Sequence, residues 1–267
     1  MSKQVESVGA VLKVFSILQA LSRSQTASLS ELETQLMMPK STIYRFLQTM
    51  QTLGYVTQNA DNERYSLTLE LFHLGAKALN NIDINKLAHP IMKHIMNETG
   101  ETVHLGELDR DAVIYIHKVE SHHSLRMASQ IGKRAEIYST AMGKILCAFG
   151  ENKELAIASL KNKDFVKHTE NTLVNYDAFL QQVEWTKQNG FAYDREENES
   201  SLFCIAVPVF DVLEHAIASM SLSFPTFRCD EAKFQKYHEL LRDASVELSK
   251  LLGSKTIEKV FGEGQTF

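Results

Sequence analysis

Residues Ser28–Val56 read SLSELETQLMMPKSTIYRFLQTMQTLGYV and contain two short helical patterns separated by a tight break. Ser30, followed three residues later by Glu33, predicts a capping box at the start of the first helix, which should run to about Met37. Pro39 predicts the first turn of the second helix, because its missing N–H costs nothing there and its fixed φ suits a helix. The stretch therefore predicts a helix-turn-helix.

The second of these helices is amphipathic. Its apolar residues recur at helical spacing on one face, at Ile43, Phe46, Leu47 and Met50. The opposite face is polar and suits DNA, because Arg45 can pair with guanine edges and Gln48 with adenine. The alternative is an ordinary surface helix whose polar face binds nothing. If the helix binds DNA, the expected contacts come from Ser41, Tyr44, Arg45 and Gln48 to bases or phosphates, and from Lys40 and Thr42 to phosphates.

A β-hairpin is expected directly after the second helix. Tyr55–Gln58 and Arg64–Leu67 are short strand-like runs, and Asn59–Glu63 between them is a polar turn. Helix, turn, helix and hairpin together make a winged helix-turn-helix, in which Arg64 places a positive charge on the wing beside the DNA backbone. The hairpin favours DNA binding over the surface-helix alternative.

The charge of the chain is unevenly distributed. The 267 residues carry a formal net charge of -5, which argues against a protein that coats nucleic acid. Residues 1–80 contain 7 Lys and Arg against 6 Asp and Glu, whereas residues 81–267 contain 21 against 27. Because the acidic part repels DNA, we expect DNA binding to be confined to the first segment.

The three cysteines, Cys147, Cys204 and Cys229, lie far apart and form no CxxC pair. This spacing supports neither a disulfide framework nor a zinc site, and it fits a reducing compartment. No apolar run approaches the roughly 20 residues of a membrane span, and the first six residues are too polar for a signal peptide. We therefore expect a cytoplasmic protein with no metal, no cofactor and no membrane partner.

The length and the 44% hydrophobic content allow two cores, and the pattern favours two domains of an α+β chain. Before the helix-turn-helix, Ser7 can cap a helix whose apolar stripe would support it, formed by Val11, Val14, Phe15, Leu18 and Leu21. After the wing, Thr68 begins a helix reaching Leu79 that is apolar on more than one side. This helix either connects the domains and contacts a second subunit, or lies buried in its own chain.

The second domain mixes helices with antiparallel strands. Helices are expected at Ile84–Glu98, after the turn in Ser139–Phe149, at Asn175–Gln188, and from Asp230 to near Leu252, and strands at Thr102–Leu108, Ala112–Val119, Leu125–Gln130, Phe203–Phe210 and Ala216–Phe224. Such a mixture indicates an antiparallel α+β sensor-like domain. The expected boundaries are 1–68 for the winged helix-turn-helix, 69–82 for a linker helix, 83–253 for the second domain and 254–267 for a frayed tail.

Four motifs in order along the chain carry a family resemblance. They are SVGAVLKVFSILQAL (Ser7–Leu21), KSTIYRFLQTMQTLGYV (Lys40–Val56), YSTAMGK (Tyr138–Lys144) and DREENESSLFCIAVPVFD (Asp194–Asp211). Together they resemble the IclR family of bacterial transcription regulators over nearly the whole chain. The resemblance implies a winged helix-turn-helix joined to a GAF-like effector domain, working as a homodimer or a dimer of dimers on a pseudo-palindromic operator.

Within this family the chain is similar to the KdgR-type branch. That similarity implies a repressor of pectin and hexuronate breakdown, released from DNA by 2-keto-3-deoxygluconate. The alternative is an activator or repressor that responds to another small acid, such as an aromatic acid, glyoxylate or pyruvate.

The resemblance also implies the positions of effector contacts. Ala141 and Met142 would bind a carboxylate through their N–H groups at the start of a helix, although this turn could also be an ordinary helix start. Ser221 and Ser223 lie two apart on a strand, so both hydroxyls face a hydroxylated ligand or both face solvent. The remaining expected contacts are Asp194 and Cys204, with Leu125 and Met127 as an apolar wall.

Two of these residues have other interpretations. Asp194 could be one charge in a solvated acidic run, and Cys204 could be an inert buried thiol or the nucleophile of an enzyme. No GxSxG, HExxH, GxGxxG or P-loop pattern is present, so we expect no catalytic residues. The chain departs from the family where Ser201 replaces a usual Gly, Phe203 a basic residue and Glu136 a common Pro, and these departures concern the effector pocket rather than the fold.

Overall fold

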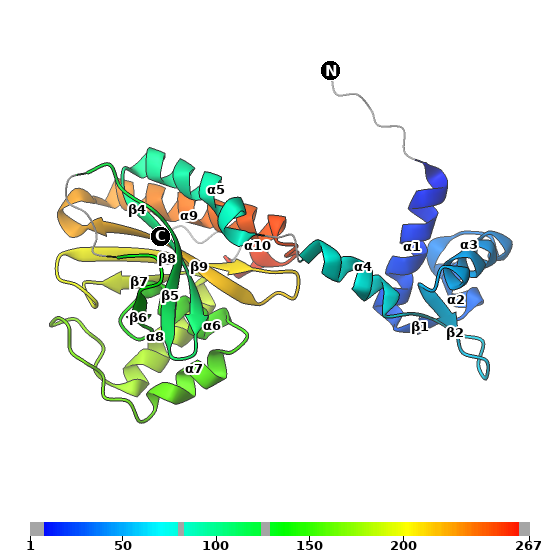
Figure 1. The fold of residues 1–267 in the computed structure, drawn as a ribbon, viewed down its shortest axis with the longest axis horizontal. Helices are drawn as coiled ribbons and strands as arrows, with labels where there is room; N and C mark the ends of the chain where they lie inside the picture. The colour runs from blue at the N-terminus through cyan, green and yellow to red at the C-terminus, as the bar shows by residue number, and fades with distance from the viewer. Residues whose placement is uncertain (1–7, 80–82, 124–128, 262–267) are drawn as a thin grey trace, which may run out of the picture. The chain divides into compact units, whose positions relative to one another are not determined.

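The computed structural model describes residues 8–79, 83–123 and 129–261. The chain divides into two compact units, Met1–Ile82 and Asp83–Phe267 (Figure 1). Leu125 and Met127 lie outside the described residues, as does most of the strand expected at Leu125–Gln130. The last two residues of that expected strand, Ser129 and Gln130, are described and are not in a strand.

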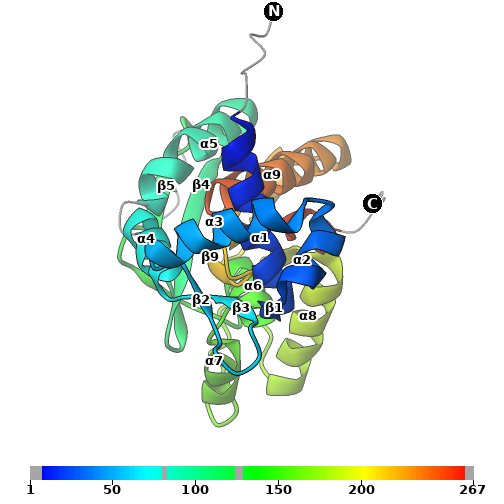
Figure 2. The same ribbon diagram turned by 90° about the vertical axis from the view of Figure 1, so that its right-hand side faces the viewer.

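The first unit groups α1, α2 and α3 together, and the β2–β3 hairpin extends from them (Figure 2). Its elements are α1 (Gly9–Ser24), β1 (Thr26–Ala27), α2 (Leu29–Leu36), α3 (Lys40–Thr52), β2 (Val56–Gln58), β3 (Tyr65–Leu67) and α4 (Glu70–Leu79). The three strands form an antiparallel sheet in the order β1-β3-β2. This arrangement is a winged helix-turn-helix, as predicted.

The predicted capping box of α2 is wrong by two residues. The Ser28 hydroxyl accepts a hydrogen bond from the Glu31 N–H at 3.3 Å, and the Glu31 carboxylate accepts one from the Ser28 N–H at 2.8 Å. Ser28 and Ser30 each precede a glutamate by three residues, so spacing alone cannot choose between them. Pro39 is also placed differently, because its ψ of 138° makes it the residue before α3 rather than part of the first turn.

The core of the first unit holds the helices and the hairpin together. Its fully buried side chains include Ile17, Leu21, Leu32, Ile43 and Leu47. The predicted apolar stripe of α1 is partly wrong, since Val11 and Phe15 are exposed and the buried residues of α1 are Ile17, Ala20 and Leu21. Exposed apolar side chains also lie on and beside α4, at Leu69, Phe72 and Leu74. The described part of α4 is therefore not a buried helix within this chain.

The second unit is built on an antiparallel sheet whose described strands have the order β6-β5-β4-β9-β8-β7. These strands are β4 (Thr102–Asp109), β5 (Ala112–Val119), β6 (Arg134–Glu136), β7 (Ala192–Arg195), β8 (Leu202–Phe210) and β9 (Ala216–Pro225). Both edge strands, β6 and β7, were absent from the sequence prediction. They are short and polar, which leaves little apolar alternation to detect.

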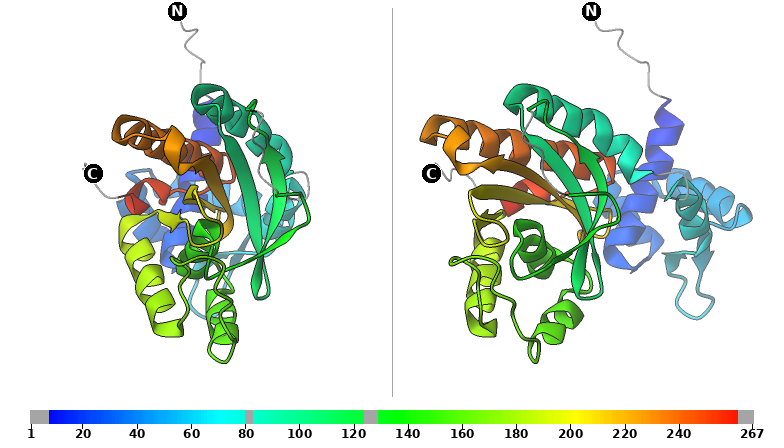
Figure 3. Two further views of the ribbon diagram at one scale, coloured as in Figure 1. Left: turned by 90° about the vertical axis from the view of Figure 1, so that its left-hand side faces the viewer. Right: turned by 60° about the vertical axis from the view of Figure 1, so that its left-hand side comes forward.

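Helices cover both faces of this sheet (Figure 3). On one face α5 (Ile84–Thr99) and α9 (Glu231–Leu251) enclose a core with Met92, Leu222 and Leu241. On the other face α6 (Ala141–Phe149) packs with α7 (Lys153–Leu160) and α8 (Tyr176–Asn189) in a second core that includes Val113, Ile145 and Phe179. The mixture of helices and antiparallel strands matches the predicted α+β class.

The expected frayed tail from residue 254 is wrong for its described part. After a 3-10 turn at Thr226–Arg228 and helix α9, the chain forms α10 (Ile257–Val260). Ile257 and Phe261 are buried in the first core of the second unit. The Glu214 carboxylate accepts hydrogen bonds from the Ser254 and Thr256 hydroxyls, which fixes the segment before α10.

Candidate functional site

The polar face of α3 is exposed. Tyr44, Arg45 and Gln48 lie on it, while the opposite face packs into the core. The Gln48 side-chain amide donates a hydrogen bond to the Tyr44 hydroxyl at 2.9 Å, so these two side chains form one polar surface. Exposed arginine and amide groups on a helix of a winged helix-turn-helix can contact base edges in a major groove.

The start of α3 carries the residues expected to contact phosphates. Lys40 and Ser41 are exposed, and Thr42 is half-buried. The Lys40 ammonium lies 3.5 Å from the Glu33 carboxylate, and both side chains are in contact with solvent. An exposed pair of this kind is weak, so Lys40 can exchange its partner for a phosphate. DNA contact by these residues remains a prediction.

Arg64 has partners inside the first unit. Its guanidinium donates to the Glu31 carboxylate, to the Thr26 hydroxyl and to the Thr26 carbonyl. These bonds connect the residue just before the wing strand β3 to β1 and to the start of α2. Arg64 therefore has a structural role that the sequence did not indicate, and its contact with DNA remains a prediction.

The second unit contains a cavity of about 380 Å³ beside the sheet. It brings together six of the residues expected to bind an effector: Ala141, Met142, Asp194, Cys204, Ser221 and Ser223. Leu125 and Met127, the other two, lie outside the described residues. These six residues come from α6, β7, β8 and β9, and the fold gathers them around this one space.

The N-terminus of α6 forms one wall of the cavity. Thr140 is the N-cap, and its hydroxyl accepts a hydrogen bond from the Gly143 N–H at 3.2 Å. Ala141 and Met142 occupy the first turn, where backbone N–H groups lack helical acceptors and the helix dipole is positive. Gly143 is required here, because a Cβ atom would lie 2.2 Å from the Ile137 carbonyl oxygen. The turn can therefore pack closely against the backbone of Ile137 and offer N–H groups to an anion.

Ser221 and Ser223 are buried and do not face solvent. Both line the cavity from β9, with Ser223 paired in register with Cys204 on β8. The Cys204 sulfur lies 3.1 Å from the Ser223 hydroxyl oxygen, and burial raises the pKa of the Cys204 thiol well above its ordinary value. A thiol held in its protonated form is a poor nucleophile, so the geometry does not favour the enzyme alternative.

Asp194 is 2% exposed, which excludes the interpretation that it belongs to a solvated acidic run. Its carboxylate accepts hydrogen bonds from the N–H groups of Glu197 and Asn198 at 2.7 and 3.3 Å. The pKa of Asp194 is raised to about 7, mainly by burial and in part by the nearby Glu197 carboxylate, against the opposing effects of the two backbone donors and Lys144. The group can therefore exchange a proton near neutral pH.

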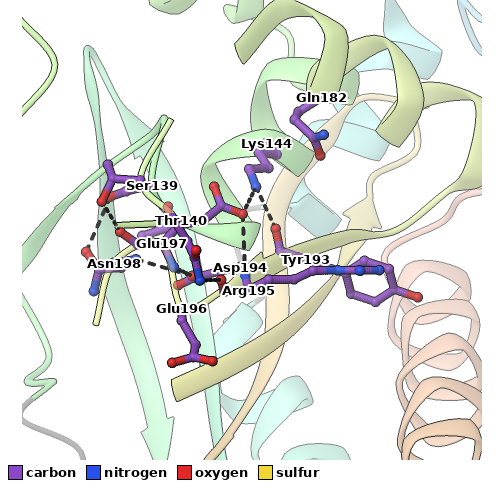
Figure 4. A network of polar contacts seen from close by, with 12 residues as sticks. Ser139, Thr140, Lys144, Gln182, Tyr193, Asp194, Arg195, Glu196, Glu197 and Asn198 are labelled. Atoms are coloured by element: carbon purple, nitrogen blue, oxygen red, sulfur yellow. Dashed lines mark hydrogen bonds and ion pairs between the residues drawn. The ribbon is translucent and has the colours of Figure 1, made fainter. Parts of the chain in front are cut away.

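A buried ion pair lies next to Asp194 (Figure 4). Lys144, on α6, is 1% exposed, and its ammonium lies 2.5 Å from the Glu197 carboxylate and donates to the Tyr193 carbonyl at 2.7 Å. The pair joins the helix that carries Ala141 to the loop after β7. It therefore fixes two walls of the cavity relative to each other.

Several cavity residues were not predicted from the sequence as effector contacts. They are His104, Tyr115, Ser129, Lys133, Arg134, Ala135, Thr140, His168, Asn198, Glu199 and Leu202. Glu136, which the sequence indicated only as a departure from the family, also lines the cavity. His104 lies opposite Ser221 in the sheet. Strand alternation could have placed it on the cavity face only if the pairing of β4 with β9 had been known. No group of three or more metal-ligating side chains occurs among the described residues.

Two domains of one known family match the sequence along most of its length. Residues 76–250 match the family described as bacterial transcriptional regulator IclR C-terminal, and residues 10–60 match the IclR helix-turn-helix domain. The chain belongs to the IclR family of bacterial transcriptional regulators. It is therefore a DNA-binding transcriptional regulator.

Relatives within the IclR family span both units. The chain is 46% identical over 253 residues to the HTH-type transcriptional regulator KdgR of Escherichia coli strain K12, covering 95% of this chain and 96% of that protein. The crystal structure of the C-terminal domain of E. coli KdgR is similar at 37% identity with a TM-score of 0.58, covering 65% of this chain and all of that one. Thermotoga maritima IclR is similar at 33% identity, with a TM-score of 0.61 and coverage of 91% and 98%.

The structure explains one departure from the IclR family pattern. Ser201 has a φ of 63°, in the left-handed region that favours the glycine usual at this position. Its N–H donates to the Glu196 carboxylate at 2.7 Å, which helps to hold this conformation. At another departure, Glu136 lines the cavity and pairs with Lys163 at 2.7 Å.

None of the helices in the described ranges has the length and apolarity that a membrane span needs.

Proposed function

We propose that this chain is a repressor of sugar-acid catabolism that leaves its operator when a small keto acid such as 2-keto-3-deoxygluconate enters the cavity of the second unit. The observation that carries this proposal is the chemistry of that cavity. It combines the N-terminus of α6, which suits a carboxylate, with the buried hydroxyls of Ser221 and Ser223, which suit ligand hydroxyls.

The size of the cavity favours a sugar acid over smaller acids. A volume of about 380 Å³ lies in the range of small-molecule sites, which is roughly 300–1,000 Å³. Glyoxylate or pyruvate would leave much of this space to water. An aromatic acid would place a ring against buried serine and aspartate groups with which the ring cannot form hydrogen bonds.

The operator is read, on this proposal, by the exposed face of α3 in a dimer. Leu12 and Phe15 on α1 and Phe72 on α4 are exposed apolar side chains, which a second copy of the chain could cover. A two-fold dimer would place two α3 helices about one turn of DNA apart, so the operator would be an imperfect palindrome. Similarity to KdgR of E. coli supports the repressor role and the keto-acid effector.

The test begins with selection of binding sites from random DNA by the full-length protein. The selected site is then bound by the protein in a fluorescence-anisotropy assay, and 2-keto-3-deoxygluconate, pyruvate, glyoxylate and an aromatic acid are added separately. We expect a palindromic site and release by 2-keto-3-deoxygluconate, with a rise in the melting temperature of the free protein.

The possible results separate the parts of the proposal. Release by a different acid alone would exclude the sugar-acid effector and keep the regulator. Tighter DNA binding on addition of the effector would exclude simple derepression. A selected site without two-fold symmetry would contradict the dimer, which size-exclusion chromatography with light scattering checks independently.

A further inference from the structure

His104 lies on the face of the sheet that borders the cavity, among polar side chains of the cavity wall. On β4 it is paired in register with Ser221 of β9 and with Lys118 of β5. Directly opposed residues of antiparallel strands point to the same face, so these side chains share the face that borders the cavity. His104 is 3% exposed and lines the cavity.

The imidazole of His104 lies between two serine hydroxyls of the cavity wall. Its Nε2 is 2.7 Å from the Ser129 hydroxyl oxygen, and its Nδ1 is 3.5 Å from the Ser223 hydroxyl oxygen. The Tyr115 ring packs against the imidazole, with ring centroids 5.1 Å apart. Lys118 donates to the Ser129 carbonyl at 2.7 Å, so the backbone of this serine is fixed as well.

His104 is uncharged in this environment. Burial, together with the Lys118 ammonium and against a smaller opposing effect of Glu120, lowers the pKa of His104 to about 3. A neutral imidazole has one N–H donor and one acceptor nitrogen. Whichever nitrogen carries the proton, one serine receives a hydrogen bond from the ring, and its own O–H can turn to a ligand. The other serine donates to the ring and can only accept from a ligand. At Ser223 the ligand competes, among the described side chains, only with the Cys204 sulfur, a weak partner 3.1 Å away.

We propose that His104 determines the specificity of the cavity: by orienting the hydroxyls of Ser129 and Ser223, it selects keto acids that carry hydroxyl groups over keto acids that lack them. A ligand hydroxyl both donates and accepts, and the two oriented serines provide one acceptor and one donor. A keto acid without hydroxyls leaves the remaining donor and acceptor of these two serines without a ligand partner, which is a basis for rejection. This inference rests on the proposed function, because it names what distinguishes the effector of the same cavity.

The test compares two acids that differ only in their hydroxyls. 2-Keto-3-deoxygluconate and 2-oxohexanoate share a six-carbon keto-acid chain, and the second has no hydroxyl groups. Isothermal titration calorimetry on the full-length protein gives the ratio of the two affinities. For His104→Phe we expect the affinity for 2-keto-3-deoxygluconate to fall at least about tenfold and that for 2-oxohexanoate to change less than about twofold.

Two further variants and a control define the role of His104. His104→Gln, whose amide reaches the Nε2 position, should restore part of the ratio by renewing the bond to Ser129. Ser129→Ala should lower the ratio in the same direction, and it decides the question if His104→Phe does not fold. His117→Phe, the same change on β5 at a histidine that contacts His89 instead, should leave both affinities unchanged.

Each other result has a defined meaning. An equal loss of affinity for both acids in His104→Phe and in Ser129→Ala would show a merely structural role and overturn the inference. A wild-type protein that binds the two acids equally would also overturn it, while leaving a keto-acid effector in place. Binding of neither acid by the wild-type protein would instead contradict the proposed function, and the inference with it.

Discussion

The Arg64 guanidinium donates to both carboxylate oxygens of Glu31, with N–O distances of 3.2 and 2.8 Å. The same carboxylate accepts the Ser28 N–H and completes the capping box of α2. The backbone hydrogen bond from Ser28 is the largest cause of the lowered pKa of Glu31, and Arg64 adds to it. The Glu31 side chain therefore helps to cap α2, the first helix of the helix-turn-helix, and also holds the wing through Arg64.

Glu31→Gln should weaken operator binding. Removal of an acidic group near DNA normally strengthens binding, because a repulsion is lost. A weaker complex would therefore report that the wing has lost its position, since the neutral amide of this variant cannot keep the ion pair with Arg64. Operator affinity measured by fluorescence anisotropy at several salt concentrations checks this, and an increase in affinity would show that the wing does not depend on the pair.

Glu33 provides the matched control for this variant. It is a half-buried glutamate of the same helix, and its partner Lys40 is expected to contact phosphate. Glu33→Gln should strengthen binding modestly, because it releases Lys40 and removes one negative charge. Opposite effects of the two substitutions would separate positioning of the wing from simple electrostatics.

Arg45→Ala should weaken operator binding about tenfold to a hundredfold and relax the base preference at one position of each half-site, because a bidentate contact with guanine is worth about 1–3 kcal/mol. Effector binding should not change, since Arg45 is exposed on the first unit. Arg23→Ala, at the end of α1, is the control and should change affinity little. Equal effects of the two substitutions in a gel-shift assay would exclude α3 as the reading helix.

The winged helix-turn-helix was predictable from sequence because local patterns determine it. The 3.6-residue periodicity of α3 separates Ile43 and Leu47 from Arg45, and the structure repeats this separation. The start of α2 was not predictable, because two serines have the same spacing to a glutamate. The role of Arg64 was also hidden, since its partner Glu31 is 33 residues away in sequence.

The cavity was predictable only in part. Strand alternation placed Ser221 and Ser223 on one side, but it could not state whether that side faced solvent or protein. The family resemblance indicated Asp194 as an effector contact, and the structure shows that this residue is buried. His104 could not be identified, because its importance arises from the pairing of β4 with β9, which joins residues more than a hundred positions apart. Cross-strand register of this kind is not encoded in a local pattern.

Lys144→Met should lower the free energy of unfolding of the second unit by about 3–5 kcal/mol, because it leaves the buried Glu197 carboxylate without its cation. Replacing both residues, Lys144→Met with Glu197→Leu, should recover much of this loss, since neither charge then remains buried. Urea unfolding followed by the fluorescence of Trp185, the single tryptophan, measures both. A double variant no more stable than Lys144→Met would contradict the ion-pair account.

Asp194 should make the stability of the second unit depend on pH. Because burial raises its pKa from 3.8 to about 7, the folded protein holds this proton more tightly than the unfolded chain. The stability that this group contributes is fully present below about pH 4 and is lost as the pH rises through about 7. In the wild-type protein, this loss adds to the effects of all other titrating groups, so a variant is needed to isolate it.

Asp194→Asn cannot ionise, and its amide oxygen can still accept the N–H groups of Glu197 and Asn198. Its stability relative to the wild-type protein should therefore increase between about pH 5 and pH 8, as measured by urea unfolding at intermediate pH values. Glu199→Gln, which removes an exposed carboxylate from the loop after β7, should show no such trend and serves as the control. A difference between wild type and Asp194→Asn that stays constant across this range would mean that the carboxyl remains ionised in the folded protein, held by its backbone donors and Lys144 against the effect of burial.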